Sequence, residues 1–150
     1  MLTQDVKQSI DDSVLCWLAT VSQSGEPNCS PKEVFTYRGQ DELLIANIAS
    51  PNSIANIAEN PQVCVSFVHV FKQKGFKLKG AATYIESGCE EYADLFALIK
   101  TMVGHFPVQG IIKIKVSHVS PIIAPSYYLV DGTTEASQIA SAKRAYGVST

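Results

Sequence analysis

The chain has 150 residues, of which 46% are hydrophobic and 17% charged, and its formal net charge is −2. This composition predicts one folded domain over residues 1–150 and excludes a largely disordered chain, because apolar burial can offset the chain entropy. The near-neutral charge balance gives no reason to expect a nucleic-acid partner.

Four cysteines are present, and none of them shows C-x-x-C spacing. Three lie in apolar or strand-like runs, where a free cysteine behaves as a small hydrophobe. The first twelve residues are polar and lack the apolar core of a signal peptide. No apolar stretch approaches the roughly 20 residues that cross a bilayer. We therefore expect reduced cysteines, a cytoplasmic location and no membrane partner.

Hydrophobic spacing and turn residues divide the first half of the chain into alternating elements. Leu2, Val6 and Ile10 are spaced as on an amphipathic helix, and Pro31 interrupts the second expected strand, which favours an edge, a bulge or a ligand-facing position. The expected strands are 14–21, 28–37 and 43–48, followed by a short helix at 51–59.

The second half is predicted to hold three more strands and two helices. Tyr92, Leu95, Phe96, Ile99 and Val103 form one apolar stripe at helical spacing. The expected strands are 63–71, 75–85 and 111–119, the helix with the stripe is 89–103, and a last short helix is expected at 134–146 in the tail 126–150. Tight turns join neighbouring strands, which favours a mainly β, antiparallel barrel or meander with flanking helices.

The best local binding signal is Ser50-Pro51-Asn52-Ser53 at the start of the helix expected at 51–59. Serine before proline is typical of an N-cap followed by the first helical position. Free backbone N–H groups at such a start can hold a phosphate, and Ser50, Asn52 and Ser53 add side-chain donors. The alternative is an ordinary helix start with no ligand.

Two further features concern lysines. Pro31 frees its strand from regular pairing, so Ser30 and Lys32 can face a flat ligand, although an exposed lysine on an edge strand is the more common arrangement. Lys77 and Lys79 point the same way on their strand and form either a solvated face or part of an anion site.

The sequence assigns no catalytic residue and no metal site. It lacks the serine-hydrolase, Walker and zinc-protease motifs and a dinucleotide fingerprint. Its three histidines, His69, His105 and His118, fall in different expected elements.

Six segments in this order and spacing resemble the pyridoxamine 5'-phosphate oxidase-like family of split-barrel proteins that bind flavin mononucleotide (FMN). The segments are LATV at 18–21, GEPNCSPK at 25–32, LIAN at 44–47, SPNSIANIAENP at 50–61, VCVSF at 63–67 and GFKLKGAA at 75–82. The resemblance covers about residues 5 to 125, and the order of the segments is more specific than any one of them.

The resemblance implies a six-stranded antiparallel Greek-key split β-barrel that forms a homodimer, with FMN in a cleft between the subunits. In such proteins the second strand and the end of the third line the flavin, and the start of the next helix holds its phosphate. The cofactor-binding residues implied here are Ser30, Pro31, Lys32, Glu33, Ala46, Asn47, Ser50, Asn52 and Ser53, with Lys77 as a further basic group.

The function implied is a flavin-dependent oxidoreductase or electron carrier. Relatives often carry Arg or Lys in the phosphate loop, where this chain has Asn52 and Ser53. Phe35 stands where the true oxidases carry a substrate lysine, so that vitamin-forming activity is not expected. The alternatives are a non-catalytic flavin reservoir and a haem-binding split barrel, which needs a histidine ligand.

Overall fold

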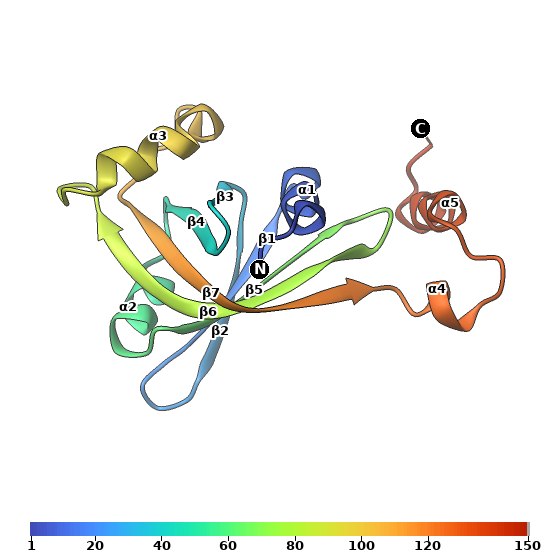
Figure 1. The fold of residues 1–150 in the computed structure, drawn as a ribbon, viewed down its shortest axis with the longest axis horizontal. Coiled ribbons are helices and arrows are strands. Elements are labelled where there is room, and N and C mark those ends of the chain that lie inside the picture. Colours follow the sequence, from blue (N-terminus) through green and yellow to red (C-terminus); the bar gives the residue numbers. More distant parts are fainter. Residues whose placement is uncertain (150) are drawn as a thin grey trace.

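A computed structural model describes residues 1–149 and shows one antiparallel sheet of seven strands with helices around it (Figure 1). The strands are β1 (Cys16–Val21), β2 (Pro27–Lys32), β3 (Phe35–Arg38), β4 (Glu42–Asn47), β5 (Gln62–His69), β6 (Lys74–Glu86) and β7 (Gly110–Ile123). The helices are α1 (Gln4–Asp12), α2 (Pro51–Glu59), α3 (Tyr92–Val103), α4 (Ser126–Leu129) and α5 (Glu135–Tyr146). The predicted mainly β, antiparallel class with flanking helices is confirmed.

The sheet curls round on itself. Its strand order is β2-β1-β5-β6-β7-β4-β3, so β2 and β3 form its two opposite edges. Only Glu33 and Val34 separate them in the chain, and three Cα–Cα steps span at most about 11 Å. The two edges must therefore come close at this end, which gives the barrel-like curvature, although no ladder of hydrogen bonds joins β2 to β3.

This crossing corrects the expected count of six strands. The single strand predicted at 28–37 is two strands, because the chain leaves the β1 side of the sheet at Lys32 and joins the β4 side at Phe35. Pro31 lies on edge strand β2, where its missing N–H leaves no central ladder incomplete. An edge was one of the positions that Pro31 was expected to favour.

Two layers of apolar side chains hold the sheet. One fills the inside of the curve and includes Leu43 and Ile45 of β4. The other lies between the sheet and α3 and includes Leu44 and Ala46 of the same strand. Because β4 is buried on both faces, its last residue, Asn47, ends in the interior beside the start of α2.

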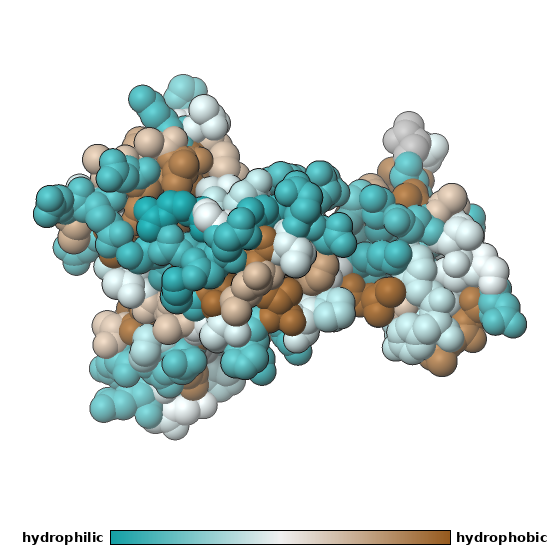
Figure 2. Space-filling view, in the orientation of Figure 1, coloured by the Kyte–Doolittle hydropathy of each residue, from teal (hydrophilic) through white to brown (hydrophobic). Residues whose placement is uncertain are grey.

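The long strands β6 and β7 continue beyond the curved part of the sheet and carry α4 and α5 at their far end (Figure 1). Figure 2 shows this C-terminal part as a separate lobe joined to the body by a narrower middle. Hydrogen bonds from Tyr127 Oη to the Lys72 carbonyl (2.7 Å) and from Gln138 Nε2 to Gln73 Oε1 (2.8 Å) fasten it to the β5–β6 turn. The tail thus lies away from α2 of its own chain.

Within residues 1–149, no helix is both long and apolar enough to cross a bilayer.

Candidate functional site

The start of α2 has the geometry predicted for Ser50 and Pro51, with one difference. The helix begins at Pro51, and Ser50 is the residue before it, but the Ser50 hydroxyl does not cap the backbone. It accepts a hydrogen bond from Lys32 Nζ of β2 instead. The first N–H groups of α2, those of Asn52 and Ser53, therefore receive no cap from this side chain, which leaves the positive end of the helix uncapped.

A second link joins the same two elements. Ser30 Oγ lies 3.3 Å from Ser53 Oγ, within hydrogen-bond distance. Ser30 and Lys32 are two residues apart on β2, so both side chains lie on the face of the strand that meets α2. Edge strand β2 and the first turn of α2 therefore form one small polar cluster from residues 23 and 18 positions apart.

A cleft of about 400 Å³ opens beside this cluster. It is lined by five of the residues implied for FMN, namely Pro31, Lys32, Glu33, Ala46 and Ser50, together with Leu15, Val34, Ile48, Ala49 and Phe106. One wall is therefore polar and the other is apolar. The combination fits a ligand with an anionic end and a flat apolar part.

The sequence analysis missed the apolar residues of the cleft, and Phe106 is the one among them that lies far in the chain from the implied residues. It lies in the loop between α3 and β7, and its side chain is 60% exposed. No local pattern marked it, because it reaches the cleft from a distant part of the chain. The only available signal was a large aromatic residue in a loop.

The electrostatics of the cleft centre on Lys32. Burial lowers the pKa of its ammonium below the usual 10.5, which shows that water compensates the charge incompletely. Its neighbour in the β1–β2 register is Cys16, whose pKa burial raises to about 12. Among residues 1–149, no carboxylate lies within ion-pair distance of Lys32. An anion in this cleft would therefore meet a cation that makes no ion pair within the described residues, although the Glu33 side chain lines the same cleft.

Five of the implied residues do not line this cleft; Ser30 and Ser53 belong to the polar cluster beside it, and the other three lie elsewhere. Asn47 is buried and faces a neighbouring groove, where its Nδ2 donates to Tyr84 Oη at 2.8 Å. Asn52 is exposed in the first turn of α2. Lys77 is exposed on β6 and lies in register with Ser66 of β5, three strands from β2, or roughly 14 Å away at the usual strand spacing.

The histidines have separate surroundings. His69 Nδ1 accepts from the Lys72 backbone N–H at 3.1 Å, which closes the β5–β6 turn. His118 is exposed on β7 beside Ser117 Oγ, at 3.1 Å. His105 precedes Phe106 in the exposed loop but does not line the cleft.

A curved antiparallel sheet with a half-polar cleft between its edge strand and a helix start defines a small β protein of the split-barrel class. The family model for pyridoxamine 5'-phosphate oxidase matches residues 2–135, and the chain belongs to this family. The search of curated proteins gave no significant match.

Solved structures share this fold at low sequence identity. HupZ from Group A Streptococcus is 23% identical, with a TM-score of 0.69 over 83% of this chain and 99% of its own. An FMN-binding protein from Syntrophomonas wolfei is 18% identical, with a TM-score of 0.69 over 82% of this chain and 87% of its own. HutZ, the haem storage protein of Vibrio cholerae, is 19% identical, with a TM-score of 0.62 over 81% and 94%. These likenesses establish the fold.

Proposed function

We propose that this protein binds FMN in the cleft beside Lys32 and Ser50 and works as a flavin-dependent oxidoreductase or electron carrier. The observation that carries the proposal is Lys32, a partly desolvated cation without a carboxylate partner, next to the uncapped start of α2. Family membership and the FMN-binding relative from Syntrophomonas wolfei support the choice of cofactor.

The phosphate would be held by Lys32 and by the donors of the first turn of α2, which include Ser53 and the exposed Asn52. Val34, Ile48 and Phe106 would pack against the ring and keep water from it. Bound FMN would supply hydride or single-electron chemistry. The role of this chain is to bind the group, orient it and place the Lys32 charge near it.

The cleft lies at the sheet edge, and we propose that a second copy of the chain covers it in a homodimer. Leu15, a cleft residue just before β1, is 37% exposed, and Trp17 on β1 is 46% exposed. These apolar groups supply a surface that a partner subunit would bury. Lys77, distant from the cleft in its own chain, is the implied basic residue that a partner would contribute.

Activity as a true pyridoxamine phosphate oxidase is not part of this proposal. Phe35 stands where those enzymes carry a substrate lysine, and it is 3% exposed, with its ring 6.2 Å from that of Phe67. A buried aromatic residue cannot present charge to a substrate phosphate. Haem binding in this cleft is disfavoured as well, since none of the three histidines lines it.

The deciding experiment is an equilibrium titration of the purified chain with FMN and, separately, with riboflavin, which has the same ring without the phosphate. We expect FMN to bind at least tenfold more tightly, with flavin absorbance bands that remain after desalting. Equal affinity for the two would contradict the phosphate site. Reduction of the bound flavin by NADH or NADPH would support the oxidoreductase, and its absence with either donor would favour the reservoir.

The dimer is tested by analytical ultracentrifugation of the same samples. A dimer with one FMN per chain is expected. A monomer that binds one FMN with full affinity would contradict the shared site.

A further inference from the structure

A second, larger groove lies on the other side of the loop that separates β4 from α2. Its volume is about 760 Å³, and it shares only Ala49 and Ser50 with the cleft beside Lys32. The start of α2, the end of β6 and the beginning of β7 enclose it, at the end of the sheet where α2 lies in Figure 1. The features of this groove described below play no part in the proposed flavin site.

One of its walls holds a buried acceptor that has no partner. Asn47 is 4% exposed, and its Nδ2 donates to Tyr84 Oη, but its Oδ1 is fully buried and receives no hydrogen bond. A buried polar atom without a partner costs about 1–3 kcal/mol of stability. Proteins keep few such atoms, and many of them serve a ligand or an ordered water.

Tyr84 can reach Asn47 because Gly110, which lies between them on β7, has no side chain. A Cβ at Gly110 would lie 2.4 Å from Tyr84 Oη, so only glycine allows the phenol to reach Asn47 across β7. The phenol oxygen accepts from Asn47, and Tyr84 also lines the groove. The Asn47–Tyr84 pair is therefore a positioned polar wall.

The side chains that line the groove carry negative charge and no positive charge. Glu86 is the only acidic side chain in its lining, which contains no Lys, Arg or His, and among residues 1–149 no cation lies within ion-pair distance of Glu86. Pro51, Ile54 and Ala55 of α2 form an apolar wall. The side-chain acceptors in the lining are thus the Glu86 carboxylate and several neutral oxygens, among them Asn47 Oδ1, next to a surface that suits a small ring or alkyl group.

From these features we infer that the groove binds a small neutral or cationic molecule that presents N–H donors next to an apolar body. The Glu86 carboxylate would accept from a donor at the groove surface, and Asn47 Oδ1 would accept from a donor that enters between the side chains now covering it. The α2 wall would pack against the apolar body. An anion of the same shape is excluded by Glu86 and by the lack of any basic group in the lining.

Three probes of one shape test this inference: benzamide, benzamidine and benzoate. They have the same ring and carry a neutral N–H group, a cationic N–H group and an anionic acceptor group, respectively. Titrations of the full-length protein, followed by ¹H–¹⁵N NMR, should shift the Asn47 side-chain amide and the Gly88 backbone amide. We expect benzamidine to bind up to about fivefold more tightly than benzamide, the gain of one exposed ion pair, and benzoate at least tenfold more weakly than benzamide.

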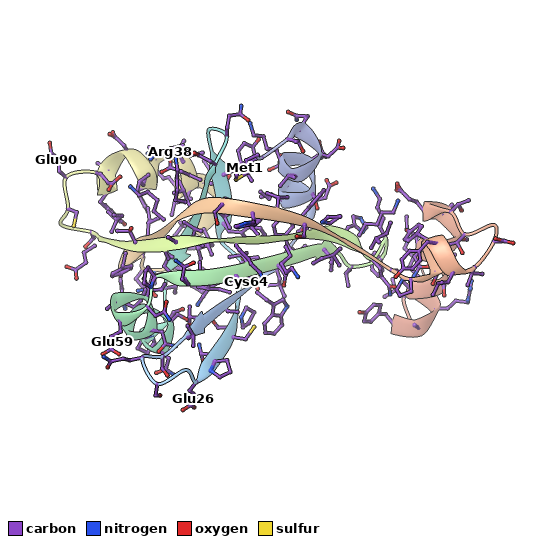
Figure 3. All side chains as sticks on the ribbon, turned by 60° about the horizontal axis from the view of Figure 1, so that its bottom comes forward. Met1, Glu26, Arg38, Glu59, Cys64 and Glu90 are labelled. Atoms are coloured by element: carbon purple, nitrogen blue, oxygen red, sulfur yellow. The ribbon has the colours of Figure 1, made fainter. Side chains whose placement is uncertain are left out.

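A charge variant gives the control. Glu86→Gln should bring the affinities for benzamidine and benzamide to within twofold of each other, because Glu86 is exposed and its loss should leave the fold intact. Glu59→Gln, at the other end of α2 (Figure 3), should leave the preference for benzamidine unchanged. Equal binding of all three probes, no shift at Asn47 or Gly88, or a preference for benzamidine that survives Glu86→Gln would overturn the inference.

Discussion

Replacing Lys32 by methionine removes the charge of the proposed phosphate site and keeps most of the side-chain volume. Two unit charges about 4 Å apart attract by about 4 kcal/mol at the effective dielectric of a protein surface. Lys32 is only half-buried, so solvent screens part of this attraction. Lys32 must also give up its hydrogen bond to Ser50, worth about 1 kcal/mol. A net loss of about 1–2 kcal/mol remains, which is about 5- to 30-fold in Kd.

The assay is an FMN titration by fluorescence quenching at several salt concentrations. The unaltered protein should lose affinity as salt rises, and Lys32→Met should be both weaker and less salt-dependent. Lys79→Met is the matched control, because Lys79 is exposed and lines a different pocket. Adding Asn52→Lys to the Lys32→Met variant should restore part of the affinity. If Lys32→Met binds FMN with the affinity and salt dependence of the unaltered protein, the placement of the phosphate is refuted.

Three further predictions concern the same structure. Ser53→Asp should weaken FMN binding at least tenfold in the same titration, whereas Ser53→Ala should cost less than threefold, because only the aspartate repels the phosphate. Burial raises the pKa of the Cys16 thiol from 9.0 to about 12, so its contribution to stability is complete below pH 9 and is lost as the pH rises towards 12. Urea unfolding at pH 8 and at pH 11 measures this loss, and a thiol reagent should label exposed Cys29 long before Cys16. Gly75→Ala should lower the free energy of unfolding by about 3 kcal/mol or more, because its Cβ would lie 1.8 Å from the Phe67 carbonyl oxygen, whereas Gly88→Ala, with open space around it, should change it little.

Much of the fold could be predicted from the sequence because its signals are local. Hydrophobic spacing and turn residues located the strands other than β2 and β3 to within about four residues, and Ser50-Pro51 marked the first residue of α2. The break between β2 and β3 could not be found in this way. Residues 28–37 are continuous and strand-like, and only the curvature of the whole sheet sends Lys32 and Phe35 to opposite edges.

For the candidate site too, residues with a local signal were predicted and residues without one were missed. Ser30, Lys32, Ser50 and Ser53 were each selected for local reasons, and the structure brings them together through two side-chain contacts. Phe106 was missed because nothing in its own segment indicates what lies opposite it. The groove beside Asn47 was also missed, since whether an amide oxygen lacks a hydrogen-bond partner depends on tertiary packing and cannot be recognised in the sequence.

The loop between β4 and α2 separates two cavities that differ in their charged side chains. On one side lies Lys32 and on the other lies Glu86, and neither makes an ion pair within residues 1–149. In the proposed phosphate site Asn52 and Ser53 are neutral, and the positive charge would come from Lys32 on edge strand β2, 18 residues before its partner Ser50. We therefore expect the preference of each cavity for anionic or cationic ligands to depend on the charged side chains that flank the loop. A comparison with relatives that considers only the residues at the start of α2 would overlook the charge of Lys32 in the cleft and of Glu86 in the groove.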